Sequence, residues 1–335
     1  MPRVVICLLL VTAACDHRES KPAPVEEPRR EPPKPAPKPV PACDPASPTA
    51  CVGDDVVECV AGGTLGRTLQ SCKGRCNQGA CVDTCAVNGV ELIYVADAAN
   101  NLRRFDPQKL PGDPFQLVGT LTCDPASSPF SMAVDRGGIA WVLYQTGKLY
   151  RVSILDAHCS GGVKPRGAPR TFGMGFASDG PKRTTEQLFV AGEDDARMLV
   201  QLDTTVQQPE WRPIAKIDAG QTRNPELTGT GEGKLFGYFA EPGGGFVQEL
   251  DRTTGKAIGK RWSLDTKAKR IEAYAFAHWG GVFYVFATGD GNSAVHAIHR
   301  KTGAIELVRE RLPFRITGAG VSTCAPELER DPDHK

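Results

Sequence analysis

An aromatic residue sits in the middle of a short apolar run five times along this chain, at intervals of 47 or 48 residues. The five aromatic residues are Tyr94, Trp141, Phe189, Phe236 and Tyr284. A turn-forming stretch follows each run, and a second apolar run ends 11 to 14 residues after the aromatic residue. Two such runs joined by Gly, Asn or Asp are typical of a β-hairpin, so each period supplies at least one hairpin.

Each period also contains two further candidate strands. Runs of small residues precede four of the aromatic runs, as in 173–177 and 273–277, and suit the place where several sheets converge on an axis. A fourth run follows a second turn, clearest at 251–256 and 299–303, whose Thr-Gly turns resemble those of quinoprotein-like propeller repeats. Four strands in about 47 residues are typical of a β-propeller blade. The sequence therefore predicts an all-β chain with a five-bladed β-propeller in residues 86–326.

The last strand is expected to close the ring. Residues 316–321 have the small-residue pattern of an innermost strand, but no aromatic run follows them. The first repeat lacks that same strand, so the C-terminal strand completes the first blade. This arrangement places Cys324 just after an inner strand and Cys85 just before the strand paired with it. A Cys85–Cys324 disulfide would lock the closure.

A small cysteine-rich module, residues 43–85, precedes the repeats. Disulfides are the default for such a density of cysteines in an exported chain. If all ten cysteines pair, at least one disulfide must join the module to the repeats. Cys123 then pairs with Cys159 by elimination. Simple up-and-down strands would, however, separate these two cysteines. Connectivity among the other six stays open, and their spacing also permits a four-thiolate zinc site, which export disfavours. The ten cysteines are Cys43, Cys51, Cys59, Cys72, Cys76, Cys81, Cys85, Cys123, Cys159 and Cys324.

The N-terminus predicts export and a lipid anchor. Residues 1–14 contain an apolar run too short to cross a bilayer, which indicates a signal peptide. The segment Leu10–Cys15 resembles the lipobox of bacterial lipoproteins, which implies cleavage before Cys15 and acylation of that cysteine, palmitate included. Ordinary secretion is the alternative. Residues 15–42, with nine prolines and no aromatic residue, are expected to form an extended linker.

These features predict a cell-envelope protein, held to a membrane through lipid. Asp16 resembles an inner-membrane retention signal of some enteric bacteria, but the choice between the periplasmic face and the outer membrane or cell surface stays open. Residues 327–335 are expected to be a disordered tail. A formal charge of +1, with no long single-sign stretch, argues against nucleic acid as a partner. We expect a monomer.

No pairing of acid and base or of nucleophile and base stands out along the repeats, and we expect neither a metal nor a cofactor. The leading hypothesis is non-catalytic binding or scaffolding of an envelope protein or glycan. The alternative is a propeller enzyme, lactonase-like or quinoprotein-like, with calcium or a quinone in the central channel. A scaffold role in outer-membrane protein assembly resembles known propeller lipoproteins by architecture alone. Candidate residues for the binding face lie on loops that lead into inner strands: Arg223, Asn224, Glu226, Arg270, Glu272 and Arg315.

Overall fold

The structure is a computed structural model that describes residues 43–44, 47–52, 55–71, 75–77, 79–82, 85–192, 197–221, 223 and 225–328. The expected signal peptide, Cys15 and the proline-rich linker lie outside these residues, as do Cys72, Asn224 and most of the expected tail. Within the described residues the only helical element is a 3-10 turn, Pro107–Lys109, and none of their helices is long and apolar enough to cross a membrane.

The cysteine-rich module contains one three-stranded and one two-stranded antiparallel sheet. Val56 and Val57 are its buried aliphatic residues, a core too small to hold a fold by burial alone. Disulfides Cys43–Cys59 and Cys51–Cys76 supply the missing constraint. Because Cys76 is bonded to Cys51, it is not available as a zinc thiolate. The strands are β1 (Thr49–Val52), β2 (Asp55–Val60) and β3 (Thr64–Ser71), then β4 (Arg75–Asn77) and β5 (Ala80–Val82).

The remaining described strands form five four-stranded antiparallel sheets, here called sheets 1 to 5. From the inner to the outer strand, sheet 1 is β25 (Ile316–Val321), β6 (Ile93–Asp97), β7 (Asn101–Phe105) and β8 (Phe115–Thr120). Sheet 2 is β9 (Pro129–Val134), β10 (Ile139–Tyr144), β11 (Leu149–Ser153) and β12 (Cys159–Val163). Sheet 3 is β13 (Phe172–Ser178), β14 (Glu186–Gly192), β15 (Met198–Leu202) and β16 (Arg212–Lys216).

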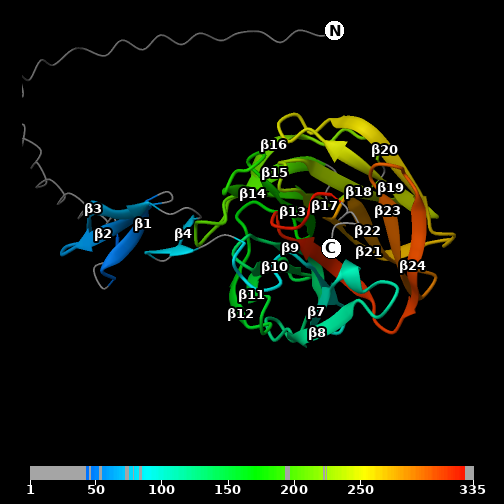
Figure 1. Cartoon of the computed structure of the whole chain (residues 1–335), viewed down its shortest axis with the longest axis horizontal. Helices are drawn as coiled ribbons and strands as arrows, with labels where there is room; N and C mark the ends of the chain where they lie inside the picture. Colours follow the sequence, from blue (N-terminus) through cyan, green and yellow to red (C-terminus); the bar gives the residue numbers. More distant parts are fainter. Residues whose placement is uncertain are drawn as a thin grey trace, which may run out of the picture. The chain divides into compact units, whose positions relative to one another are not determined.

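Sheets 4 and 5 repeat the pattern. Sheet 4 is β17 (Glu226–Gly229), β18 (Leu235–Glu241), β19 (Gly244–Leu250) and β20 (Ala257–Asp265). Sheet 5 is β21 (Ile271–Trp279), β22 (Val282–Gly289), β23 (Asn292–His299) and β24 (Ile305–Leu312). The innermost strands contact one another in the cyclic order β25, β9, β13, β17, β21 and back to β25 (Figure 1). This closed order of sheets is a β-propeller, and the all-β prediction is confirmed.

Small residues on the inner strands allow the neighbouring backbones to touch. A Cβ atom added to Gly229 on β17 would lie 2.2 Å from the carbonyl oxygen of Phe176 on β13. One added to Gly173 would lie 2.2 Å from the carbonyl oxygen of Pro225. Any side chain at these two positions would push the sheets apart, which explains the small-residue runs in the sequence.

The five repeat aromatics occupy equivalent places on the second strand of each sheet. Each faces a small or short side chain on the inner strand, and the pairs are Tyr94 with Gly320, Trp141 with Ala133, Phe189 with Gly175, Phe236 with Thr228 and Tyr284 with Ala277. An apolar cluster fills the space between each pair of consecutive sheets. Because each sheet buries both faces only against its neighbours, the ring is the smallest unit that has a complete core.

The C-terminal strand closes the ring as the repeat pattern predicts. Strand β25 pairs antiparallel with β6, with Ile316 opposite Asp97 and Val321 opposite Ile93. The structure contains a disulfide between Cys85 and Cys324, the pair expected from this topology. The first and last parts of the propeller are therefore joined both by backbone hydrogen bonds and by a covalent bond.

Cys123 and Cys159 are also joined, although simple strand directions would place them at opposite ends of neighbouring sheets. The end of β8 reaches the turn between β11 and β12, where a Cβ on Gly119 would lie 3.0 Å from the Cβ of Ala157. The right-handed twist of each sheet tilts the outer strand away from the direction of the inner strand. The expectation from flat, vertical strands is therefore wrong for these outer elements.

Candidate functional site

The predicted binding-face residues lie where the inner strands begin, an end of the ring here called the start face. Arg223 and Arg315 are exposed, and Asn224 lies outside the described residues. Arg270 Nη2 lies 3.2 Å from Glu272 Oε1, and 77% of the Arg270 side chain is exposed. The start face therefore presents arginine side chains to solvent.

Glu226 differs from the expected rim position because it is only 3% exposed. It is the first residue of β17, and its Oε2 accepts a hydrogen bond of 2.8 Å from the Ser131 hydroxyl on β9. Strand β13 lies between β9 and β17 in the ring, so this bond crosses the region of the axis. Glycines 173 and 175 on the intervening strand carry no side chain that would obstruct the bond. Glu226 thus belongs to the interior of the ring rather than to an exposed face.

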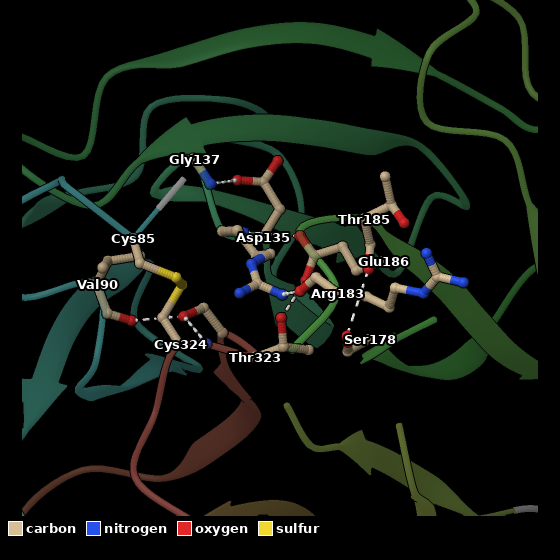
Figure 2. The surroundings of a disulfide bond; sticks show 12 residues. Cys85, Val90, Asp135, Gly137, Ser178, Arg183, Thr185, Glu186, Thr323 and Cys324 are labelled. Atoms are coloured by element: carbon tan, nitrogen blue, oxygen red, sulfur yellow. Dashed lines mark hydrogen bonds between the residues drawn. A yellow bond between two sulfur atoms is a disulfide. The ribbon is translucent and has the colours of Figure 1, made fainter. Parts of the chain in front are cut away.

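A second polar cluster lies at the opposite end, here called the end face, where the inner strands finish. Asp135 Oδ1 accepts the backbone N–H groups of Gly137 and Ile139, and its Oδ2 accepts the indole N–H of Trp141 at 3.1 Å. Glu186 Oε1 accepts the Arg136 backbone N–H at 2.7 Å, and its Oε2 accepts the Thr323 hydroxyl at 2.7 Å. Figure 2 shows this cluster beside the Cys85–Cys324 disulfide.

The environment of Glu186 favours its neutral form. Desolvation raises the pKa of Glu186 to about 7, and the negative charge of Asp135 acts in the same direction. The hydrogen bonds from Arg136 and Thr323 oppose this shift only in part. A carboxyl group that titrates near neutral pH therefore connects sheets 2 and 3 to the segment that follows the closing strand.

That segment, residues 322–327, reaches several sheets. The Ser322 hydroxyl donates to the Val90 carbonyl at 2.8 Å, and the Gly280 N–H donates to the Pro326 carbonyl at 2.7 Å. Glu327, the first residue of the expected tail, accepts the Glu232 N–H at 3.1 Å. The segment ties the turns of sheets 3, 4 and 5 to the start of sheet 1. Sequence reasoning missed this role because the partners lie in turns of unrelated sequence.

Two cavities flank the turn Asp203–Thr205 between β15 and β16. The larger, of about 500 Å³, is lined by the start of β14, the end of β15, strand β16 and Arg136. The smaller, of about 300 Å³, lies between sheet 2 and the same turn, and Trp141 and Arg151 line it. Thr204 and Thr205 border both. The repeat pattern does not predict these cavities, because the Asp203–Thr205 turn and the outer strands complete walls that the repeated strands begin.

The described residues contain no group of three or more His, Cys, Asp or Glu side chains arranged to hold a metal ion. On the axis, Glu226 supplies one carboxylate and Ser131 one hydroxyl. A calcium site ordinarily needs six to eight oxygen ligands. The described axial residues therefore do not fit the calcium centre of the enzyme alternative.

No protein family model and no curated protein matches the chain. Solved structures that resemble it include a chain of the mitotic checkpoint complex, with 11% identity and a TM-score of 0.36 over 64% of this chain and 60% of that one. Glutaminyl cyclase of Myxococcus xanthus shows 16% identity and a TM-score of 0.36 over 58% of this chain and 71% of that one. BamB from Moraxella catarrhalis shows 15% identity and a TM-score of 0.29 over 80% of this chain and 76% of that one.

The chain thus spans less than two thirds of the mitotic checkpoint complex chain. At these identities and scores, none of the three proteins informs the activity of this chain. The assignment of a propeller rests instead on the sheet order and on the closure of β25 against β6.

Proposed function

We propose that this chain is a bacterial cell-envelope lipoprotein, anchored through lipid on Cys15, that presents a five-bladed propeller to a protein or glycan partner without catalysing a reaction. The proline-rich linker then serves as a spacer between the membrane and the folded part. The observation that carries the binding role is the contact between inner strands in the interior of the ring. The Ser131–Glu226 hydrogen bond of 2.8 Å crosses this interior, and inner-strand backbones touch at glycines.

The enzyme alternative places a quinone or calcium in the central channel. A planar quinone at the level of Ser131 and Glu226 would have to break their hydrogen bond. Removing a hydrogen-bond donor from a buried carboxyl group is unfavourable. The chemistry of a channel cofactor is therefore poorly supported here, and recognition on the outer surface of the ring is better supported.

The anchor is tested with Cys15→Ser. Cells grown with labelled palmitate should incorporate the label into the wild-type chain and not into the variant, and the variant should leave the membrane fraction. Cys7→Ser is a suitable control because it removes a cysteine of the same N-terminal segment that lies outside the lipobox. A labelled, membrane-bound Cys15→Ser variant would show that the anchor proposal is wrong.

The binding role is tested on the purified full chain in two assays. Immobilised chain should retain an envelope protein or glycan, and free chain should compete for it. A panel of esters, lactones and glycosides should show no turnover. If the wild-type chain turns over one of these substrates and a folded Glu226→Gln variant does not, the binding role is wrong and the enzyme alternative is supported.

A further inference from the structure

The two cavities beside the Asp203–Thr205 turn have walls that are already in place. Asp203 Oδ1 accepts both the backbone N–H and the hydroxyl of Thr205, at 2.9 and 2.6 Å. The Arg166 N–H donates to the Pro209 carbonyl at 2.8 Å, and the Trp211 N–H donates to the Arg166 carbonyl at 2.9 Å. The loop between β15 and β16 is thus tied to the segment that follows sheet 2. A preformed site loses little conformational entropy when a ligand binds.

Most of the residues that line the larger cavity are polar. Ten of its twelve lining residues are polar, and only Pro213 and Ile214 are apolar. Threonine hydroxyls and the Gln187 and Gln201 amides, which hydrogen-bond to each other, offer both donors and acceptors. Such a lining suits a ligand covered with hydroxyl groups better than an apolar ligand.

Three arginines and two carboxyl groups, those of Glu186 and Asp203, line the two cavities, so positive charges outnumber negative ones. Arg136 and Arg212 line the larger cavity and Arg151 lines the smaller one. The side chain of Arg212 is 70% exposed, and its ion pair with Glu210 is long, at 3.7 Å. Arg136 Nη1 donates to the Arg183 carbonyl at 2.8 Å, while its buried Nε has no hydrogen-bond partner among the described residues.

The carboxyl groups nearby are occupied by contacts of their own. Asp203 accepts two hydrogen bonds within its turn, and Glu186 accepts those of Arg136 and Thr323. Guanidinium groups bind carboxylates through two parallel hydrogen bonds, so the arginines are suited to planar carboxylates in particular.

The smaller cavity adds an aromatic wall. Trp141 lines it, and the indole N–H is fixed by the hydrogen bond to Asp135 Oδ2 at 3.1 Å. Arg151 stands directly opposite Trp141 in the β10–β11 register. An amphipathic ring beside a guanidinium group gives one cavity both an apolar contact and a charge.

We propose that the two cavities form one binding site for an acidic oligosaccharide, whose hydroxyl groups meet the threonines and glutamines and whose carboxylates meet Arg151 and Arg212. This proposal rests on the binding role given above and names its ligand class. The Asp203–Thr205 turn lies between the two parts of the site, so the ligand spans it. Neighbouring sugar units would then occupy the larger and the smaller cavity.

The test uses the purified full chain and calorimetric titration with short uronate oligosaccharides of galacturonate, glucuronate and mannuronate. Each has a carboxyl-reduced counterpart, which replaces only the carboxylates by CH₂OH groups. We expect at least one uronate to bind with one site per chain, and its reduced counterpart to bind at least tenfold more weakly. Arg212→Gln and Arg151→Gln should each weaken binding by about tenfold or more, the loss expected for one charge-assisted pair.

Sheet 1 offers a matched control. Arg104 pairs with Gln116 across β7 and β8, and Gln201 pairs with Arg212 across β15 and β16. Arg104 lies opposite Tyr94 and Gln201 lies opposite Phe189, so the two pairs occupy equivalent places in the repeat. Arg104→Gln removes an arginine that lines neither cavity and should leave binding unchanged.

Several outcomes would overturn the site. These are the absence of uronate binding, equal affinity for the reduced sugars, an equal loss in Arg104→Gln, or equal affinity for a glutamate-rich peptide. If the envelope partner is retained equally by wild type and Arg212→Gln while no uronate binds, the binding role stands and the acidic-glycan site falls. If nothing is retained and no uronate binds, both fall.

Discussion

The two ends of the ring use charged side chains in different ways. At the start face, Arg223 and Arg315 are exposed, and the Arg270–Glu272 pair is open to solvent on the arginine side. At the end face, Asp135 and Glu186 accept hydrogen bonds from backbone groups and from Trp141 and Thr323. The first set adds little to the fold because water solvates it. The second set holds turns of different sheets together.

This difference follows from where the chain closes. The inner strand of sheet 1 is the last strand in the sequence. The residues that follow it lie at the end face, where they contact sheets 3, 4 and 5. The polar side chains there must be satisfied, since an unpaired buried polar group is costly. The exposed arginines of the start face carry no such requirement, because water solvates them.

The largest effect should come from the covalent closure. Cys85→Ser with Cys324→Ser opens a disulfide of sequence separation 239, and Cys123→Ser with Cys159→Ser opens one of separation 36. Because the entropy of the unfolded chain grows with the loop that is released, we expect losses of about 5 and about 4 kcal/mol in unfolding free energy. Urea titration measures both. If opening the Cys85–Cys324 disulfide lowers the unfolding free energy less than opening the Cys123–Cys159 disulfide, the view that the end face holds the ring closed is wrong.

The pH dependence of stability should reveal Glu186. Its pKa of about 7 lies above the ordinary value of 4.5, so the folded state binds the proton more tightly than the unfolded state. The resulting stabilisation is fully present below about pH 4.5 and is lost as the pH rises through about 7, by an amount on the order of 3 kcal/mol. Glu186→Gln keeps an acceptor for the Arg136 N–H and removes the titration.

We therefore expect the wild-type unfolding free energy, measured from pH 4 to pH 8, to fall relative to that of Glu186→Gln. Glu272→Gln at the start face is the matched control, and its profile should follow that of wild type. Parallel profiles for wild type and Glu186→Gln would show that this carboxyl group does not titrate in this range.

The sequence predicted the parts of the fold that repeat. The aromatic residues Tyr94 and Tyr284 occupy equivalent strands because the same burial problem recurs in every sheet, and the unpaired strand at 316–321 identified the closure. What could not be predicted lies between repeats. Asp135, in the turn after β9, and Glu186, the first residue of β14, are about fifty positions apart, and only the curvature of the ring brings them together. The sequence predicts a rim position for Glu226 from its place before an inner strand. It gives no sign of the contact with Ser131, which lies two sheets away.

A third prediction concerns the Thr323 hydroxyl. Thr323→Val keeps the shape of this buried side chain but removes the donor to Glu186 Oε2. We expect a loss of about 1 to 2 kcal/mol at pH 8, where Glu186 is ionised. A double-mutant cycle with Glu186→Gln isolates the pair, and a coupling energy below about 0.3 kcal/mol would mean that the contact does not hold the closing segment.

The smallest effect should come from the start face. Arg270→Ala removes one partner of the 3.2 Å pair with Glu272, and 77% of the Arg270 side chain is exposed to solvent. An exposed ion pair contributes about 0 to 1 kcal/mol, because solvent screens the attraction and two long side chains lose freedom in forming it. We expect the unfolding free energy, measured by urea titration, to fall by no more than about 0.5 kcal/mol. A loss as large as that of Thr323→Val would mean that exposed pairs at the start face hold the fold as strongly as the buried contacts of the end face.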